Sequence, residues 1–511
     1  MTELQNLLVD ARPVDHPTAR NRGVGRQTIG MLSGLHQIGV PLIALVESDA
    51  EADLLGAAVV GIHIERWSPA LVRQYAVADT WFLCTQLMLH PIPLDVVPRT
   101  ITEAGLPVAA IMHDVIPERY PELYQVDPTP RAQVQLRGML TRTLDALLAV
   151  SQFAATTAAH ELRFPPERVR VIGAGVDAAF QPTQTDPWPR LRASLVDDGR
   201  KVVLMVSGTD ARKNTERLIC AWGLLAPSTR SGRRLVIAAS ISTALLHRWQ
   251  TWADEAGVAD SVTFTGGVTD DEMVALHQVA ILAIMPSTEE GFGLPVLEAA
   301  ACGCPVIVSD CSSLPEVLDF PAAEFDPYDA SSIAAAIERA LDDPSHRLRL
   351  LAAGQRAVER WTWANTGRAV LESLESLGPR QARQLRPPPH RIALIGRFDE
   401  SPTGLDNEAL VIALRAAPHA PELHVLVDNQ GTDVPTHAME LRFPERALGR
   451  FVHRSLFDHV VTIDVDEHGN RTAREATGET LTLTPDSTSA ATALLDCLQL
   501  AASTAPLDAG N

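Results

Sequence analysis

The chain has 511 residues, enough for two or three domains, and its hydrophobic content of 46% is typical of a globular protein with a large core. The formal net charge of -20 argues against nucleic acid as a partner, because phosphate backbones require basic surfaces. The sequence contains no apolar run long enough for a transmembrane helix, no signal-peptide pattern at its start, and no metal-ligand spacing among its six cysteines. A reducing cytoplasm is therefore the expected location.

Short apolar runs alternate with helical periodicity along most of the chain, in two successive series. The first series comprises 7–11, 40–46, 80–84, 108–114, 146–151 and 169–176, and the second comprises 202–208, 234–240, 261–266, 280–286 and 305–310. Apolar runs separated by helices predict parallel sheets. We expect an α/β fold with two doubly wound, Rossmann-like domains, at residues 1–183 and 184–377, that bind ligands at the carboxyl ends of their strands.

Two candidate features follow strands of the first domain. Gly23 and Gly25 lie in a glycine- and arginine-rich stretch, NRGVGR, between the first strand and a helical run. A plain turn would explain this stretch as well as a ligand-binding loop would. His113 and Asp114 close the strand VAAIMHD, where they form either a structural turn pair or part of a site. Both features lie where an open α/β sheet binds its ligands.

The second domain carries one of only two lysines in the chain, and this scarcity favours a specific role for a lysine that is present. Lys201 begins an apolar strand and is expected to be a solvated edge residue. Arg212 and Lys213 lie between the glycine turn after that strand and a predicted helix at 215–225. This order is typical of a phosphate site, in which lysine supplies a point charge and arginine a planar fork. The alternative is an ordinary helix start with two exposed cations.

The most informative segment runs from 285 to 317, and at its centre a glycine turn separates Glu290 from Glu298. The turn begins with Gly291, Phe292, Gly293 and Leu294. An apolar strand leads in and a helix follows, a geometry that points backbone N–H groups at an anion. The flanking carboxylates cannot bind phosphate, so their expected task is to accept hydrogen bonds from sugar hydroxyls. A capping glutamate and a surface glutamate would give the same bare spacing.

The sequence PSTEEGFGLPVLEAAACGCPVIVS resembles the donor-site motif of the family 4 glycosyltransferases, retaining enzymes of the two-domain GT-B fold. The resemblance places Glu290 and Glu298 on the family's paired glutamates. It implies that Glu298 holds the ribose hydroxyls of a nucleotide, that Glu290 faces the transferred sugar, and that Lys213 and the glycine turn take the diphosphate. The commoner family pattern has an arginine where this chain has Thr209, and Arg212 would substitute for it.

The first domain carries further matches to the family. The stretch around Gly23 and Gly25 resembles the family's first loop, which faces the diphosphate and the acceptor, with Arg22 and Arg26 as accessory charges. The HDVIP sequence that begins at His113 matches the family's active-site histidine. Its aspartate neighbour would then orient the loop or the acceptor. The resemblance covers residues 1–377, and the donor half is its most specific part.

Other expectations concern packing and the carboxyl-terminal region. Glu316 lies in a helix-start motif behind the donor pocket and is expected to cap or support structure. Residues 361–377 predict a closing helix, which in the GT-B fold often returns to brace the first domain. After a proline- and arginine-rich linker at 378–390, residues 391–511 begin with a strand and loop that vaguely resemble another GT-B amino-terminal half. We expect an extra α/β domain there, degenerate or truncated, for acceptor binding or protein contacts.

The resemblance implies a retaining glycosyltransferase with His113, Lys213 and Glu290 as catalytic residues. It would move a sugar from a nucleotide diphosphate, mannose from GDP-mannose by family habit, to a glycan or lipid-linked acceptor in cell-surface polysaccharide biosynthesis. Retention by front-face attack needs no side-chain nucleophile, and neither a metal ion nor another cofactor is expected. The expected location includes peripheral contact with the inner face of the cytoplasmic membrane. Base and sugar would depend on the loops at 240–245 and 266–268.

Two other functions would share this fold. One is a non-catalytic GT-B module that acts as a partner in a polysaccharide assembly complex, although the presence of Lys213, Glu290 and Glu298 argues against it. The other is a different GT-B chemistry, such as glycan phosphorolysis or sugar-nucleotide epimerisation. Slow hydrolysis of a nucleotide sugar without acceptor would favour a transferase over the binding module. The fold alone does not separate these functions.

Overall fold

A computed structural model of the protein describes most of residues 4–377 and the strands of a third sheet beyond residue 390. Within 4–377 the ranges not described are 16–22, 78, 89–95, 99, 102–103, 127–133, 135–136, 139, 142–143 and 192–198. Beyond residue 377 the described residues are 391–396, 422–427, 440–442, 459–465, 471–475, 480–483, 490 and 493–494. Arg22, with the rest of residues 16–22, and the predicted linker at 378–390 therefore lie outside the described residues.

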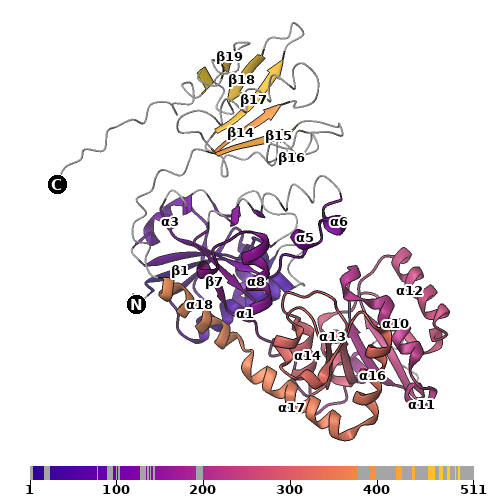
Figure 1. Ribbon diagram of the computed structural model, residues 1–511. Helices are drawn as coiled ribbons and strands as arrows, with labels where there is room; N and C mark the ends of the chain where they lie inside the picture. Colours follow the sequence, from indigo (N-terminus) through magenta and orange to yellow (C-terminus); the bar gives the residue numbers. More distant parts are fainter. Residues whose placement is uncertain are drawn as a thin grey trace.

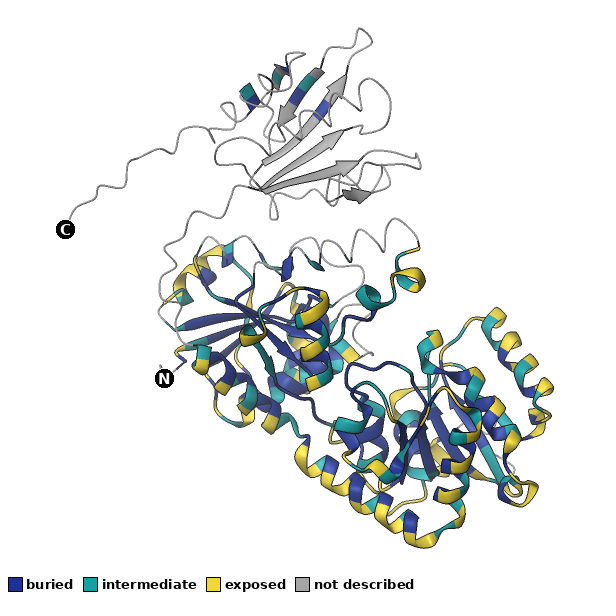
Figure 2. Cartoon of the chain, in the orientation of Figure 1, coloured by how far each residue is buried: buried dark blue, intermediate teal, exposed yellow. Residues whose placement is uncertain are grey.

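The first domain is built on a seven-stranded parallel sheet with the order β3-β2-β1-β4-β5-β6-β7. Its strands are β1 (Asn6–Asp10), β2 (Leu42–Val46), β3 (Ile64–Arg66), β4 (Thr80–Cys84), β5 (Val108–Met112), β6 (Ala146–Ala149) and β7 (Val169–Val171). Its described helices are α1 (Gly23–Gln37), α2 (Asp49–Ala58), α3 (Pro69–Tyr75), α5 (Ile116–Arg119), α6 (Pro121–Tyr124) and α8 (Gln152–Glu161). The strands β2, β4, β5 and β6 are buried along their whole length, as their continuous apolar runs predicted (Figure 2).

The second domain repeats this plan with a six-stranded parallel sheet of order β10-β9-β8-β11-β12-β13. Its strands are β8 (Lys201–Val206), β9 (Arg233–Ala238), β10 (Val262–Phe264), β11 (Ala280–Met285), β12 (Val306–Ser309) and β13 (Glu324–Phe325). Its helices are α10 (Thr215–Leu224), α11 (Pro227–Arg230), α12 (Thr243–Glu255), α13 (Asp270–Val279), α14 (Leu294–Ala301), α15 (Leu314–Leu318), α16 (Ala330–Asp342) and α17 (Pro344–Arg360). Strand order reverses between β8 and β11, and ligands of such sheets bind at that switch point. The two predicted doubly wound domains are confirmed.

A third sheet, of order β16-β15-β14-β17-β18-β19, lies beyond the linker. Its strands are β14 (Arg391–Gly396), β15 (Glu422–Val427), β16 (Glu440–Arg442), β17 (His459–Val465), β18 (Arg471–Glu475) and β19 (Thr480–Leu483). The first four are parallel and follow the same order as β3-β2-β1-β4 of the first domain, whereas β18 and β19 are antiparallel. The described strands beyond residue 390 therefore begin in the order of a doubly wound sheet and then depart from it.

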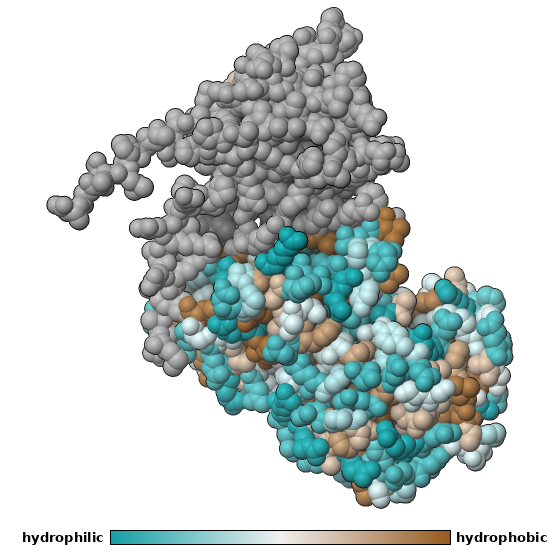
Figure 3. All heavy atoms as spheres, in the orientation of Figure 1, coloured by the Kyte–Doolittle hydropathy of each residue, from teal (hydrophilic) through white to brown (hydrophobic). Residues whose placement is uncertain are grey.

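The visible surface of the first two domains mixes polar and apolar residues (Figure 3). Exposed large apolar side chains include Leu123 and Val126, at and just beyond α6. Within the described part of the chain, no helix combines the length and the apolar character that crossing a bilayer requires.

The last helix of the second domain, α18 (Trp363–Leu377), crosses back and packs on α1, as the sequence predicted (Figure 1). Glycines make this contact close. A Cβ atom on Gly34 would lie 1.9 Å from the carbonyl oxygen of Trp363, and one on Gly30 would lie 2.1 Å from the Trp363 ring. The opposing Gly367 in turn approaches the backbone of Gly34. This crossing therefore holds α1 and the second domain together.

Replacing Gly34 with alanine is expected to destabilise the protein by about 1–3 kcal/mol, because the new methyl group overlaps a backbone carbonyl that cannot move alone. A matched control is Gly56→Ala in α2, where the nearest atom to a new Cβ is a side-chain carbon at 3.8 Å. Urea unfolding followed by circular dichroism compares the two variants. Equal midpoints for both would contradict the close crossing.

Candidate active site

The turn between β11 and α14 has the strand–turn–helix geometry that the sequence predicted. Gly293 is the N-cap residue of α14 and has a φ of 96°, a conformation that glycine adopts at little cost. A Cβ there would also lie 2.6 Å from a methyl carbon of Leu314. Pro295 follows in the first helical turn, where its missing N–H costs little. The helix therefore begins at Leu294, at the carboxyl end of the sheet.

Gly291 lies against the first domain. A Cβ on Gly291 would lie 2.0 Å from the carbonyl oxygen of His113, so only glycine permits this approach. The hydroxyl of Ser151, the N-cap residue of α8, donates to the Gly291 carbonyl at 2.6 Å. The carboxyl ends of β5 and β6 thus meet the glycine turn of the second domain, and at Gly291 the close neighbour is the protein's own backbone.

Glu290 is the centre of the charged cluster. Its buried carboxylate accepts from Lys213 Nζ at 2.5 Å and from Arg212 Nη1 at 2.9 Å. Burial alone would raise the pKa of Glu290, but the charges of Lys213 and Arg212 hold it at about 2, so the carboxylate is ionised at neutral pH. Ser312 and Ser313 fix its backbone through hydrogen bonds of 3.1 and 3.0 Å. Both cations that the sequence singled out therefore converge on Glu290.

The loop that carries these cations is tied to the sheet by Asn214. This residue has a φ of 62°, and its side-chain amide donates to the carbonyls of Pro286 and Pro327 at 2.9 and 2.7 Å. Because Asn214 is also the N-cap residue of α10, the loop at β8 and the glycine turn at β11 are held side by side.

Glu298 forms an ion pair with a residue of the first domain. Arg26, in the first turns of α1, donates through Nη1 to Glu298 at 2.9 Å and through Nη2 to Asp270 at 2.8 Å. The buried His277 lies behind Glu298, with its Nε2 3.6 Å from a carboxylate oxygen. Arg26 therefore joins the two domains at the second glutamate of the motif, and the sequence had placed this arginine only as an accessory charge.

His113 lies at the end of β5, and both of its ring nitrogens are buried without a hydrogen-bond partner among the described residues. Burial lowers its pKa to about 4, although the charge of Asp114 opposes the shift. The ring is therefore neutral at neutral pH. Asp114 accepts from the backbone N–H of Ile116 at 3.2 Å and so shapes the turn.

Lowering the pH from about 6.5 towards 4 is expected to destabilise the protein through His113. The unfolded chain takes up a proton near pH 6.5, whereas folded His113 does so only near 4, so stability falls as the pH falls by up to about 1.4 kcal/mol per unit. Urea midpoints at pH 7 and 5 for the wild type and His113→Asn test this. The variant should lose less stability than the wild type over this interval, and equal losses would contradict the assignment.

The structure corrects the expected positions of Gly23, Gly25 and the Phe292 side chain, which were predicted to contact the donor. Gly23 and Gly25 were expected in a loop before a helix, but α1 already begins at Gly23, so both lie in its first turn. The Phe292 ring is buried and packs edge-on against Trp361 at a centroid distance of 5.2 Å. Its side chain thus belongs to the core beside Trp361, whose ring in turn approaches Gly173 of the first domain.

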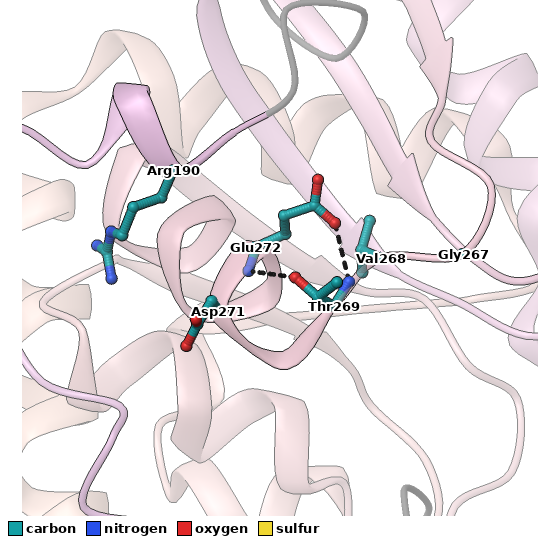
Figure 4. Close-up of a pocket in the computed structure, with 6 residues that line it drawn as sticks. All are labelled: Arg190, Gly267, Val268, Thr269, Asp271 and Glu272. Atoms are coloured by element: carbon teal, nitrogen blue, oxygen red, sulfur yellow. Dashed lines mark hydrogen bonds between the residues drawn. The ribbon is translucent and has the colours of Figure 1, made fainter.

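A pocket of about 640 Å³ lies at the carboxyl end of β10, where the sequence placed a loop that would choose the base (Figure 4). It is lined by Arg190, Gly267, Val268, Thr269, Asp271 and Glu272. Thr269 and Glu272 form a reciprocal capping box at the start of α13, which makes one wall rigid. The neighbouring Asp270 is the residue that pairs with Arg26, so the pocket adjoins the contact at Glu298. Among the described residues, no three His, Cys, Asp or Glu side chains gather as a metal site would require.

Further contacts at the domain junction involve Glu289 and Asp210, to which the sequence analysis assigned no role, and Glu316. Glu289, one position before the predicted glutamate, accepts from Arg119 and from Tyr120 of the first domain. Asp210 accepts from Tyr124. Glu316, expected to cap or support structure, does cap a helix, but its carboxylate accepts from the first backbone N–H groups of α8 in the other domain.

Two family models match successive parts of the chain. The model described as Glycosyltransferase Family 4 matches residues 22–180, and the one described as Glycosyl transferases group 1 matches 189–357. A GDP-mannose-dependent alpha-(1-6)-phosphatidylinositol monomannoside mannosyltransferase of Mycolicibacterium smegmatis is 30% identical over 265 residues, which are 50% of this chain and 68% of that protein. The chain belongs to the family 4 glycosyltransferases. The two matched regions coincide with the two doubly wound domains.

The serotype-specific mannosyltransferase WbdA of Escherichia coli is 32% identical to this family 4 chain over 293 residues. These residues are 56% of this chain and 34% of WbdA, so the chain spans about a third of that relative's length. The crystal structure of HepE from Anabaena in complex with UDP and glucose matches with a TM-score of 0.56 at 19% identity, over 73% of this chain and 99% of HepE. This similarity confirms the GT-B fold.

Proposed function

We propose that the protein is a retaining mannosyltransferase that transfers mannose from GDP-mannose to a glycan or lipid-linked acceptor in polysaccharide biosynthesis. The observation that carries the proposal is the convergence of Lys213 and Arg212 on Glu290, beside His113, where the two domains meet. Mannosyl transfer is inferred from the relatives, several of which are named as mannosyltransferases. The proposal places the protein in the cytoplasm, with its acceptor supplied at the membrane face.

The charges that develop as the glycosidic bond breaks determine which atoms of the transition state the site must stabilise. When the glycosidic bond to the diphosphate breaks, negative charge grows on the leaving phosphate and positive charge on the anomeric carbon. In this proposal Lys213 and Arg212 would stabilise the phosphate, together with the positive end of the α14 helix dipole. Because Glu290 accepts hydrogen bonds from both cations, an incoming diphosphate would share or displace these bonds.

The remaining groups would orient the sugar and the nucleotide. Glu290 is ionised and would accept hydrogen bonds from hydroxyls of the transferred sugar, and the neutral His113 would bind it from the first domain. Glu298 would accept from the ribose hydroxyls beside Arg26, and the adjoining pocket would take the base. Holding donor and acceptor together in this way supplies an orientation gain that reaches about 7–11 kcal/mol in favourable cases.

Retention is proposed to proceed by attack on the face from which the diphosphate leaves, with a leaving phosphate oxygen taking the acceptor proton. Slow hydrolysis of GDP-mannose in the absence of acceptor, followed by proton NMR, tests both donor and stereochemistry. We expect α-mannose as the first product, before mutarotation. β-Mannose as the first product would refute retention, and no hydrolysis of any nucleotide sugar would favour the non-catalytic module.

The proposal includes no metal ion, because Lys213 and Arg212 supply the positive charge that the leaving diphosphate requires. Adding EDTA is therefore expected to leave the hydrolysis rate unchanged within about twofold, whereas removal of one charged partner costs on the order of 10²–10³. A loss that Mg²⁺ or Mn²⁺ restores would contradict this part of the proposal.

A further inference from the structure

A short segment of the first domain reaches the loops of the second from across the domain junction. It comprises α5, Tyr120 and α6, that is Ile116–Tyr124, and we call it the bridging segment. It follows the turn after His113 and lies at the edge of the first domain (Figure 1). Three of its side chains bond to the second domain, and each bond ends one to three residues from a proposed diphosphate- or sugar-binding group.

The first bond joins Tyr124 to Asp210. The phenol oxygen lies 2.6 Å from each carboxylate oxygen and donates to this carboxylate. Burial raises the pKa of Tyr124, and the hydrogen bond and charge of Asp210 raise it further, so the phenol stays protonated and remains a donor at neutral pH. The contact is therefore a charge-assisted hydrogen bond between domains.

Asp210 connects Tyr124 to Arg212, because it bonds to both residues. Its carboxylate accepts from the backbone N–H of Arg212 at 3.1 Å and from its Nε at 3.3 Å. With its Nε edge held there, the guanidinium directs Nη1 to Glu290 at 2.9 Å and to the Glu289 carbonyl at 2.7 Å. The orientation of the Arg212 guanidinium thus depends on the position of the Asp210 carboxylate.

A second set of contacts ends on the same arginine. Arg119 and Tyr120 donate to the buried carboxylate of Glu289, the latter at 3.1 Å. The backbone carbonyl of Glu289 is the one that accepts from Arg212. The bridging segment therefore holds two acceptors of the Arg212 guanidinium: the Asp210 carboxylate, which accepts from Nε, and the Glu289 carbonyl, which accepts from Nη1.

We propose that Tyr124, through Asp210, and Tyr120 with Arg119, through Glu289, are positioning residues that orient Arg212 towards the donor diphosphate when the two domains meet. The inference rests on the proposed function, since it assigns Arg212 to a diphosphate. In this proposal the bridging side chains act through Glu289 and Asp210 and not on the donor itself. They make the geometry of the diphosphate site depend on contact with the first domain.

A double-mutant cycle tests this. The affinity for GDP, with UDP alongside, is measured by titration calorimetry for the wild type, Tyr124→Phe, Arg212→Ala and the double variant. We expect Tyr124→Phe to weaken binding roughly tenfold in the wild-type background, as for loss of a hydrogen bond to a charged group, and less than about twofold when Arg212 is already absent. Tyr75→Phe, in α3, is the matched control and should bind like the wild type.

The outcomes separate the inference from the proposed function. Wild-type protein that binds GDP or UDP while Tyr124→Phe binds equally well would overturn the inference and leave the proposed function standing. So would a loss of the same size in both backgrounds, because a merely structural role of the tyrosine persists without Arg212. Wild-type protein that binds neither nucleotide would refute the proposed function and the inference together.

Discussion

Replacing Lys213 with alanine is expected to lower kcat for nucleotide-sugar hydrolysis by about 10²–10³-fold. The ammonium group lies 2.5 Å from Glu290 at the carboxyl edge of the sheet, where it would meet the charge that develops on the leaving diphosphate. A point charge at this place acts in a partly water-excluded site, so neither solvent nor Arg212 alone replaces it. Steady-state kinetics on GDP-mannose provide the measurement.

The chain offers a matched control for this variant. Lys201, the other lysine, is exposed at the start of β8, and Lys201→Ala should keep wild-type kinetics. Circular dichroism and the unfolding midpoint establish that Lys213→Ala remains folded. A folded Lys213→Ala variant with kcat within about threefold of the wild type would contradict the electrostatic role, because one lost charged partner typically costs far more.

Replacing Glu290 with glutamine is expected to separate binding from turnover. The carboxylate now neutralises Lys213 and Arg212, so a neutral amide should leave both cations free and keep GDP affinity equal or raise it. Turnover should fall by about 10²-fold, since the ionised group that would orient the sugar is lost. Calorimetry with GDP and single-turnover kinetics with GDP-mannose measure the two effects separately.

Glu298→Gln serves as the contrasting variant. It alters the other glutamate of the motif, which pairs with Arg26 and would hold the ribose, so GDP binding itself should weaken. The account would be contradicted if Glu290→Gln lost GDP binding and Glu298→Gln retained it, because the two carboxylates would then have exchanged roles.

The strands that the sequence predicted best are those buried on both faces. The run at 80–84 has the same bounds in β4, and the runs that became β5, β6 and β11 begin at their predicted residues. Two edge strands were missed, β3 with the sequence Ile-Glu-Arg and β13 with only two residues, whereas the edge strands β7 and β10 lie within the predicted runs 169–176 and 261–266. Such short, partly polar segments form strands because they pair with the backbone of a neighbouring strand. The hydrophobic periodicity of their own sequence does not indicate this pairing.

The site was predictable where its residues are adjacent in the chain. The turn around Gly293 and the loop at Lys213 each contain strand, turn and helix in sequence, so local rules apply. The contacts that unite them were not predictable in this way. Tyr124 and Asp210 are separated by 86 positions, and Arg26 and Glu298 by 272. Their pairing depends on how the two domains meet, which no local pattern encodes.

Two expectations of position were wrong. The stretch at Gly23 and Gly25 was expected in a loop before a helix, but α1 begins at Gly23. Phe292 was grouped with the diphosphate turn because of its neighbours, yet its ring packs beside Trp361. A local motif fixes neither the residue at which a helix begins nor the side on which a ring packs.

The central claim is that Lys213 and Glu298 belong to a single nucleotide-sugar site. Thermal stabilisation by GDP-, UDP-, dTDP- and ADP-sugars, measured for the wild type, Lys213→Ala and Glu298→Ala, tests it most directly. We predict a rise in the unfolding temperature with one nucleotide class, GDP before the others, and its loss in both variants. Folded wild-type protein that no nucleotide sugar stabilises would contradict the account, as would stabilisation that survives both substitutions.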